Sequence, residues 1–379
     1  SAGGELHGAW LRVEGGRIAA LGTAPVAQPE RGEEVVDLGA SVVVPGLVDL
    51  HVHGGGGASY TTGDPAEAAR AVAFHRRNGT TRTLASLVTA PLADLLAATS
   101  ALAEVAKDGL IEGVHLEGPF LAPARCGAQD PHFLLAPDPE VLRLLLEAGR
   151  GSVRMITVAP ELPGAVELIR RIVDAGVVAA IGHSDADYDT ARAAIVAGAR
   201  VATHLWNGMR PLHHRDPGIV GAALEEERVV CELIADGYHV HSSALALSFR
   251  AAAGRIALVT DAISAAGATD GCYRLGPALV RVEQGEARLD GSDTIAGSTI
   301  TMAAGLRHAV LAGAVDLATA SRAASAVPAR LLGLEGETGS LAVGKAADLV
   351  ALDADLHPVA VMRSGEWWCL DLPAAAGAG

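Results

Sequence analysis

The 379-residue chain has little of what disulfide-linked, membrane-spanning or nucleic-acid-binding proteins need. Its four cysteines (Cys126, Cys231, Cys272 and Cys369) are far apart and form no CxxC pair, which argues against a disulfide framework and favours a reducing cytoplasm. No apolar run approaches the roughly 18 residues that cross a bilayer. No charged segment followed by an apolar one marks a signal peptide. We therefore expect a cytoplasmic protein with no membrane partner.

Aromatic residues and net positive charge are also scarce. Phe, Trp and Tyr make up 3% of the chain, so the core must be built from Ala, Val, Leu and Ile. Such a composition is typical of buried parallel strands covered by Ala-rich helices. The formal net charge of −15 argues against nucleic acid and anionic membranes as partners. An anionic substrate would therefore need a local cluster of hydrogen-bond donors.

What the chain does contain is a regular alternation of two kinds of segment. Half of its residues are hydrophobic, and apolar runs alternate with segments rich in Ala and Leu. Eight such runs, from VVVPGLVDLHVHG to RIALVTDAI, predict eight β/α units and therefore an α/β fold, a (β/α)8 TIM barrel. Helices are expected between the runs, one beginning at Asp64 and Pro65 and another over residues 187–198.

The two ends of the chain have a different pattern, in which short apolar stretches are broken by Gly, Asp and Pro. GAWLRVEGGRIAALG predicts a hairpin that turns at residues 14–16. Neither end is long enough to bury a core alone, so we predict one small β-sandwich built from both. The predicted division is 1–45 and 336–379 for the sandwich and 46–335 for a metal-dependent barrel. The Ala- and Gly-rich tail after Pro373 is expected to be disordered.

Polar side chains interrupt the apolar strands at one end only, the end where a TIM barrel builds its active site. His51 and His53 are two residues apart, so they lie on the same side of an extended strand and suit a divalent transition metal. Glu117 follows an apolar strand, where a carboxylate is rarely buried without a partner, and its two oxygens can bridge two cations. The strand-end residues, in chain order, are His51, His53, Glu117, His183, His204, His239 and Asp261.

Each of these residues also has a plain structural interpretation. An HxH pair alone is about as often incidental as functional, and a carboxylate such as Glu117 could form a salt bridge at the barrel rim. A single histidine at a strand end is more often a satisfied core residue than a ligand. Asp261 could cap the following helix, although its place after an apolar run makes it the best candidate for a general base. Found together at successive strand ends, these residues favour a metal site.

The motifs PGLVDLHVHG, HLEGPF, IGHSDA, THLWNGM, ADGYHV, LVTDAISAAG and IAGSTITM follow one another along the chain. In sequence and in order they resemble the amidohydrolase superfamily and, within it, the N-acetylglucosamine-6-phosphate deacetylases. The resemblance spans essentially the whole chain. It implies a metal-dependent enzyme that hydrolyses a phosphorylated N-acetyl amino sugar, N-acetylglucosamine 6-phosphate, to glucosamine 6-phosphate and acetate. It also implies metal-activated hydroxide, an Asp that acts as general base and then as acid, and a homodimer.

The resemblance implies a role for each motif residue. Glu117, His183 and His204 match the metal site that all family members share. His51 and His53, with Asp261 and the bridging Glu117, match the second site of binuclear members. Two divalent metals per chain (Zn, Fe, Co or Mn) are therefore expected. The implied substrate-binding positions are Asn207, Gly208, Arg215, His239, Ile295 and Ala296, of which Arg215 can serve the neighbouring subunit of the dimer.

One position departs from the family pattern. The family often has a substrate-contacting histidine twelve residues after the metal-binding glutamate, and this chain has Gln129 there. A glutamine can still hydrogen-bond a sugar hydroxyl, but it carries no charge. Alternatives stay open: N-acetylgalactosamine 6-phosphate or a cyclic amide as substrate, or a non-enzymatic relative kept for binding. Comparing phosphorylated with free sugars separates the substrates, and eroded metal ligands, which this chain does not have, would mark the non-enzyme.

Overall fold

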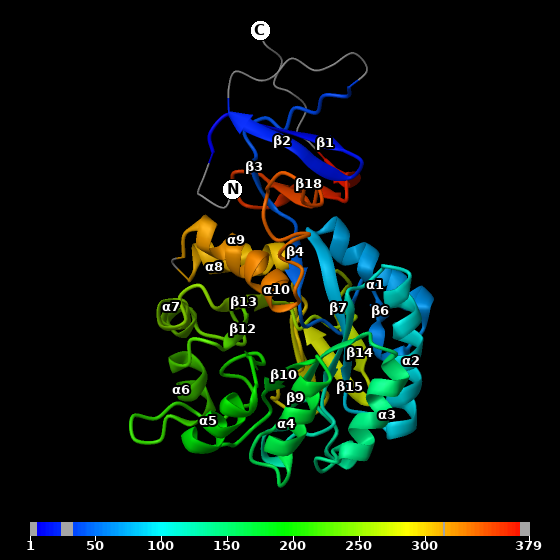
Figure 1. The fold of residues 1–379 in the computed structure, drawn as a ribbon, viewed down its shortest axis with the longest axis vertical. Coiled ribbons are helices and arrows are strands. Elements are labelled where there is room, and N and C mark those ends of the chain that lie inside the picture. The colour runs from blue at the N-terminus through cyan, green and yellow to red at the C-terminus, as the bar shows by residue number, and fades with distance from the viewer. Residues whose placement is uncertain (1–5, 24–32, 314, 372–379) are drawn as a thin grey trace.

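The computed structural model of the protein describes residues 6–23, 33–313 and 315–371. Within them, a barrel of parallel strands is surrounded by helices, and antiparallel sheets from the chain ends lie above the barrel in Figure 1. This arrangement confirms the predicted α/β class, with a TIM barrel and a small β unit made from both chain ends. The exact domain boundaries stay predictions. The tail after Pro373, expected to be disordered, lies outside the described residues.

The eight apolar runs of the sequence form the eight barrel strands. Each strand pairs in parallel with the next one along the chain. The two end strands are joined beyond their last residues, where the N–H of His53 donates to Ala262 O at 2.8 Å and that of Asp261 donates to His51 O at 2.8 Å. The strands are β4 (Leu47–Asp49), β7 (Thr80–Val88), β8 (Gly113–Glu117), β9 (Val153–Val158), β10 (Val178–Ile181), β11 (Val201–Ala202), β12 (Val230–Ile234) and β13 (Ile256–Val259).

Helices cover the outside of the barrel, and their start signals act as predicted. The Asp64 side chain accepts a hydrogen bond from the N–H of Ala66 and so caps α1, in which Pro65 is the first residue. Asp187 caps α5 in the same way, and Gly198 ends it. The helices are α1 (Pro65–Arg77), α2 (Leu92–Lys107), α3 (Pro139–Gly149), α4 (Ala165–Asp174), α5 (Tyr188–Ala197), α6 (Gly218–Glu225), α7 (Ser242–Ala251), α8 (Met302–Leu311), α9 (Leu317–Ala324) and α10 (Ala326–Leu331).

Two apolar clusters hold the barrel together. The larger one lies between the strands and the surrounding helices. The smaller one fills the barrel interior with side chains such as Val48, Leu84 and Met155, and residues at α10, including Val327 and Ala329, pack against it. Burying one such Leu, Val or Met contributes about 1.5–3 kcal/mol, so the interior is a packed core and not a channel.

The chain ends form two antiparallel sheets that share a core. The predicted hairpin consists of β1 (Ala9–Glu14) and β2 (Arg17–Thr23). Ile18 of this hairpin packs with Leu349 and Met362 of the second sheet. The second sheet consists of β3 (Val42–Pro45), β17 (Leu349–Leu352), β18 (Pro358–Arg363) and β19 (Glu366–Leu370). Segments more than 300 residues apart in the chain therefore complete one small unit.

A further antiparallel sheet is absent from the sequence-based prediction. Its apolar face, which includes Leu275, Val280 and Val282, packs on Val88 at the end of β7 and on Ile263 just after β13. This sheet therefore covers part of the barrel mouth, by which we mean the end where the strands finish. Its strands are β14 (Gly271–Leu275), β15 (Ala278–Glu283) and β16 (Glu286–Leu289).

Candidate metal centre

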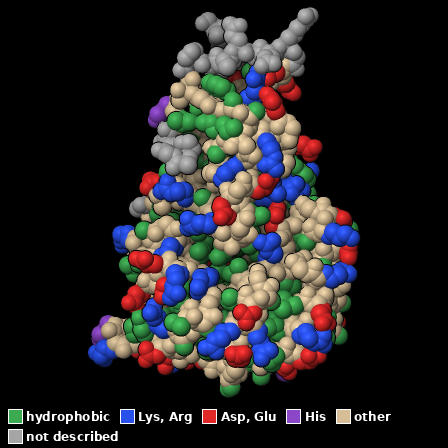
Figure 2. Space-filling model, viewed as in Figure 1, with side chains coloured by type: hydrophobic (Ala, Val, Ile, Leu, Met, Phe, Trp, Pro, Cys, Tyr) green, Lys and Arg blue, Asp and Glu red, His purple; other side chains and the backbone are tan. Residues whose placement is uncertain are grey.

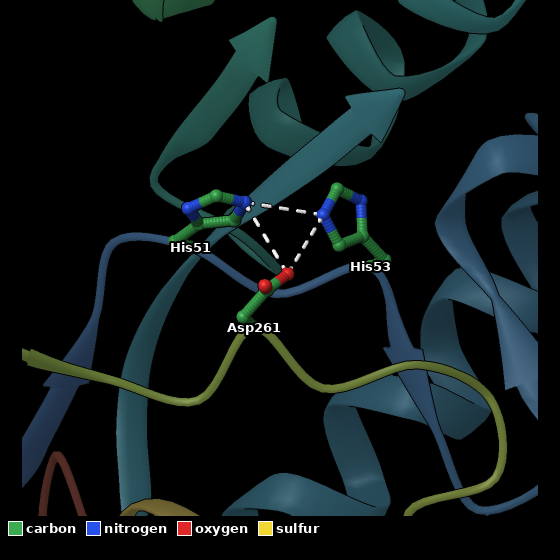
Figure 3. A group of neighbouring side chains, drawn as sticks. All are labelled: His51, His53 and Asp261. Carbon is green, nitrogen blue, oxygen red and sulfur yellow. Dashed lines mark hydrogen bonds and ion pairs between the residues drawn. The ribbon is translucent and has the colours of Figure 1, made fainter. Parts of the chain in front are cut away.

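The structure brings the six predicted metal-site residues together at the barrel mouth. They form two groups of three buried side chains whose ligand atoms lie within 4.8 Å of one another. Figure 3 shows the first group, in which two imidazoles and a carboxylate point toward a common centre. We call these groups the first triad (His51, His53 and Asp261) and the second triad (Glu117, His183 and His204).

The first triad is a nearly equilateral arrangement of acceptor atoms. The Nε2 atoms of His51 and His53 are 3.1 Å apart. Asp261 Oδ1 lies 3.5 Å from His51 Nε2 and 3.1 Å from His53 Nε2. Two facing imidazole nitrogens and a carboxylate oxygen at these distances need a shared cation or shared protons between them.

The second triad has the same geometry. Glu117 Oε1 lies 2.9 Å from His183 Nε2 and 3.1 Å from His204 Nε2, and the two Nε2 atoms are 3.0 Å apart. The other oxygen, Glu117 Oε2, lies 3.3 Å from His53 Nε2. The Glu117 carboxylate therefore contacts both triads, as a bridging ligand must.

These separations fit a small divalent ion. Zinc bound to nitrogen or oxygen at about 2.0–2.1 Å in a tetrahedron sets its ligand atoms about 3.3 Å apart. The observed separations of 2.9–3.5 Å lie on either side of that value. Imidazole and carboxylate ligands also suit Zn, Fe, Co and Mn. The donor set therefore fits a divalent metal in each triad.

The charges of the site show the same need for a cation. Burial lowers the pKa of His51, but Asp261 and Glu117 outweigh this effect and raise that pKa well above its ordinary value. The pKa values of His53 and His183 are raised by their carboxylate neighbours against burial as well. Burial raises the pKa of Glu117, but the surrounding histidines hold it well below its ordinary value. The site without metal is thus an acceptor cluster that attracts positive charge.

Three of the six residues have a backbone conformation that is rare for anything but glycine. The φ angles of His183, His204 and Asp261 are +47°, +30° and +49°. Non-glycine residues in this left-handed region carry strain and gather at functional sites. The strained turn directs each side chain inward just where its strand ends, which the sequence pattern did not indicate.

Buried polar residues outside the predicted set surround the metal ligands. Asp49 accepts hydrogen bonds from the Thr260 hydroxyl at 2.6 Å and from the N–H of His51, and so ties the ends of β4 and β13 together. Burial raises the pKa of Asp49 to about 7. Glu232, on β12, is fully buried and lies 3.3 Å from His51 Nδ1. The sequence signal for Asp49 and for Glu232 was a single acidic residue inside an apolar run. Such a residue predicts a buried partner, because a buried charge needs one.

The predicted sugar-binding stretch lies beside the second triad. The Gly208 carbonyl accepts from the N–H of Ser184, and a side chain at Gly208 would meet His183 Nδ1 at 3.1 Å. Gly208 also has a φ of +58°, so only glycine suits this position. Asn207 donates to the His204 carbonyl at 3.2 Å. The backbone of this stretch can therefore approach a ligand that sits over the metals.

Three further predicted substrate contacts border the mouth. His239 follows β12, and its Nδ1–H donates to Asp236 Oδ2 at 2.6 Å, which leaves Nε2 available. Burial lowers the pKa of His239, but Asp236 outweighs it and raises that pKa. Ile295 and Ala296 lie in a segment that is hydrogen-bonded to Asp261 at the mouth. The N–H of Ser298, two residues after Ala296, donates to Asp261 O at 2.8 Å.

Gln129 and Arg215 are placed very differently from each other. Gln129 is buried, its amide donates to Glu117 Oε2 at 2.6 Å, and its oxygen accepts from the N–H of Thr89 at 2.7 Å. Arg215 is exposed, and among the described residues its side chain and N–H form hydrogen bonds with the neighbouring His214 and His213. The loop that leads into α6 projects from the body of the molecule in Figure 1. Within one chain, Arg215 therefore does not reach the metal ligands.

The exterior carries both signs of charge. On the face drawn in Figure 2, Lys and Arg side chains alternate with Asp and Glu, and no single-sign patch dominates. No helix within the described residues is long and apolar enough to cross a membrane. The four cysteines are all free thiols.

Comparisons with known proteins place these motifs in context. The Amidohydrolase family matches residues 42–370. An N-acetylgalactosamine-6-phosphate deacetylase of Escherichia coli O157:H7 is 38% identical over 94% of this chain and 93% of its own length. An N-acetylglucosamine-6-phosphate deacetylase of Vibrio furnissii is 37% identical over 86% of this chain and 82% of its own.

A solved structure resembles the whole chain. It is the N-acetyl-D-glucosamine-6-phosphate deacetylase of Mycobacterium smegmatis, as an aspartate-to-alanine variant in complex with N-acetyl-D-glucosamine-6-phosphate. It is 48% identical, superimposes with a TM-score of 0.91, and the match covers 95% of this chain and 94% of that one. Sequence and fold thus point to the same group of enzymes.

Proposed function

Since the chain belongs to the amidohydrolase family, we propose that it is a metal-dependent deacetylase that hydrolyses N-acetylglucosamine 6-phosphate to glucosamine 6-phosphate and acetate. The observation that carries the proposal is the pair of buried triads, which are linked because Glu117 of the second triad also contacts His53 of the first. Relatives that match nearly the whole chain bear the names of deacetylases for phosphorylated N-acetyl sugars.

The two triads would hold one divalent ion each, with Glu117 between them. Such ions, when bound, polarise the amide carbonyl and lower the pKa of a water molecule toward neutrality. His51, His53, His183 and His204 would hold such ions as neutral imidazoles through Nε2, the atom that each directs inward. The metal could be Zn, Fe, Co or Mn, because these ligands suit all four.

Asp261 serves as the general base and then as the general acid. Its Oδ1 faces the imidazoles of His51 and His53, and the buried site keeps bulk water away from this oxygen. Burial raises the pKa of Asp261, but His51 and His53 outweigh it and lower that pKa, so the carboxylate is ionised and able to accept a proton from the attacking water. The same proton then passes to the leaving amine of the sugar. His239 is held by Asp236, which raises the pKa of its imidazole, and in its protonated form it donates from Nε2–H to the carbonyl oxygen as that oxygen gains charge.

The phosphate group would be bound by backbone and arginine donors. The Asn207–Gly208 backbone lies beside the second triad and is assigned to the sugar phosphate, and the segment at Ile295 and Ala296 is assigned to the acetyl end. Arg215 is exposed and, within the described residues, hydrogen-bonds His213 and His214 rather than the triads, so we assign it to the site of a second subunit in a homodimer. An arginine fork is the expected partner of a phosphate dianion in a chain with a net charge of −15. Gln129 is assigned to the sugar hydroxyls, once substrate draws it from Glu117.

N-acetylgalactosamine 6-phosphate is the second candidate substrate. The curated relative with 38% identity is named for that sugar, which differs from the glucosamine derivative at one hydroxyl. We favour the glucosamine derivative because the solved structure with 48% identity is a complex with it. Widely spaced free cysteines further support a cytoplasmic location for the protein.

The direct test is acetate release, with metal content measured on the same sample. We expect turnover of N-acetylglucosamine 6-phosphate with about two ions per chain, slower turnover of the galactosamine derivative, and no turnover of the sugar without phosphate. Arg215→Ala should raise KM for the phosphorylated sugar about tenfold or more, because a charged hydrogen bond contributes about 1.5–3 kcal/mol. A metal-loaded protein that releases no acetate from any phosphorylated N-acetyl sugar would refute the proposal.

A further inference from the structure

Glu232 is a buried carboxylate that the reaction described above does not use. It lies on β12 in the apolar run CELI and has no exposed surface. Its Oε2 accepts from His51 Nδ1–H at 3.3 Å and from the backbone N–H of His204 at 3.1 Å. Its Oε1 has no hydrogen-bond partner among the described residues. One carboxylate therefore contacts a ligand of each triad while half of it is unsatisfied.

His51 is the one ligand histidine that a carboxylate orients. The Nδ1 atoms of His53 and His183 donate to backbone carbonyls, those of Ser86 at 3.2 Å and Arg125 at 2.9 Å. The Nδ1 atom of His204 is buried without a partner in the described structure. A negatively charged acceptor fixes the tautomer of its imidazole and makes the other nitrogen a stronger metal ligand. Among these four histidines, a carboxylate therefore strengthens a ligand of the first triad and none of the second.

A buried charge of this kind is costly unless something offsets it. Leaving a buried polar atom without a partner costs about 1–3 kcal/mol, and more when the group is charged. Within the described residues, the ion pairs of Glu117, Asp261 and Glu232 all involve histidines, and none involves Lys or Arg. Asp49 differs from Glu232, because the Thr260 hydroxyl and two backbone N–H groups satisfy it.

We propose that Glu232 is a positioning residue that holds His51 in the metal-binding tautomer and supplies the charge that lets the mouth bind a second divalent ion. The inference rests on the proposed function, because it takes the triads as the metal sites of the enzyme. Glu117, Asp261 and Glu232 together carry three negative charges. One divalent ion leaves one negative charge and two ions leave one positive charge. Without Glu232, the first ion neutralises the remaining two carboxylates and a second ion leaves two positive charges.

The substitution Glu232→Gln separates charge from shape. The glutamine oxygen can still accept from His51 and His204, while its NH2 group takes the place of the unpartnered Oε1. The expected result is a protein that keeps the first ion but binds the second about 10–100-fold more weakly, the usual effect of removing such an outer partner. Glu232→Met, which also removes the hydrogen bonds, should weaken the second ion further.

The experiment titrates metal-free protein with Zn2+ in the presence of a competing chelator and counts bound ions by mass spectrometry of the elements. The melting temperature of the metal-free proteins is the second readout. Metal-free Glu232→Gln should melt at or above the wild-type temperature, because a buried carboxylate with one unpartnered oxygen has been replaced by a neutral amide. Glu112→Gln is the matched control: it removes a carboxylate that pairs with Arg82 far from the mouth, so it should lower the melting temperature and keep both ions.

Two results would overturn the inference. One is a Glu232→Gln protein that binds both ions as tightly as the wild type does. The other is a metal-free Glu232→Gln protein that loses stability as Glu112→Gln does, which would make Glu232 a structural residue only. A wild type that binds two ions but releases no acetate would instead refute the proposed function and leave the metal count to decide on Glu232.

Discussion

Two clusters of buried charge lie at opposite ends of the barrel, and they are balanced in different ways. Where the strands begin, Arg82 Nε is 2.9 Å from Asp348 Oδ2, and its Nη1 is 3.0 Å from Glu112 Oε1. The Thr338 hydroxyl also donates to Asp348 at 2.9 Å. We call these four residues the Arg82 cluster. Here the chain itself supplies a cation for its anions.

At the mouth, by contrast, acceptors face acceptors. Within each triad, imidazole nitrogens and carboxylate oxygens lie 2.9–3.5 Å from one another. The Arg82 cluster joins the barrel to β17 of the chain-end sheet and is complete after folding. The two triads are complete only when positive charge comes from outside the chain. The comparison separates charges that stabilise the fold from charges that serve a ligand.

The largest expected effect comes from Asp261→Asn. We expect kcat to fall by about two to four orders of magnitude, because the variant lacks the general base and acid. Most of the bound metal should remain, since five of the six ligands are intact, and the metal-free protein should be no less stable. Acetate release and metal content on one sample test this. Activity within tenfold of the wild type would remove Asp261 from the catalytic role.

The mirror-image substitution is Asp348→Asn in the Arg82 cluster. It leaves the mostly buried Arg82 with Glu112 alone, and breaking a buried pair costs about 3–5 kcal/mol, so the free energy of unfolding should drop by about 3 kcal/mol. The kcat of the folded enzyme should stay at the wild-type value. Urea unfolding of metal-free protein, with kcat measured below the transition, checks both parts. If Asp348→Asn lost activity without losing stability, the Arg82 cluster would not be a group of charges that only stabilises the fold.

A smaller effect, spread over pH, is expected from His75. This histidine donates to the Gly54 carbonyl at 2.8 Å, away from any carboxylate, and burial lowers its pKa to about 4. This lowered pKa is thus opposite in direction to the raised pKa values of His51, His53 and His183. Above pH 6.5 the imidazole is neutral in both the folded and the unfolded state. Below pH 6.5 only the unfolded chain takes up the proton, so stability is lost as the pH falls toward 4, by about 3 kcal/mol in all.

The measurement compares metal-free wild type with His75→Gln by urea unfolding at pH 7, 6, 5 and 4.5. The stability difference between the two proteins should shrink as the pH falls, since the ligand histidines contribute equally in both. A difference that stays constant with pH would mean that burial does not depress the pKa of His75.

Much of the fold and of the candidate site could be predicted because each signal is local. An apolar run that ends in a polar residue identifies a barrel strand and the side chain at its mouth, as for Glu117 and Asp261. What could not be predicted depends on contacts between distant residues. Glu232 and His51 lie 181 positions apart, and nothing in either segment names the other. The left-handed backbone of His183 and His204 likewise arises from the packing at the mouth.

The β14–β16 sheet was missed for a different reason. Its strand ALVRVE ends in the alternating apolar and polar residues VRVE, and turns flank it, so the pattern was present. It stands inside a barrel unit, where the expected next element is a helix. The order of strands and helices fixed by the TIM barrel therefore masked a local signal that was correct.

The central claim is that the barrel mouth is an acceptor cluster completed by two divalent ions, and a metal titration tests it most directly. Metal-free protein would be titrated with Zn2+ while bound ions and the melting temperature are recorded together. The account predicts that each chain binds two ions and that the melting temperature rises with each ion. The free energy of unfolding should rise by about 2.7 kcal/mol per site when free Zn2+ is 100 times the dissociation constant. A protein that binds no Zn2+ at the mouth, or whose stability is unchanged when it does, would contradict the account.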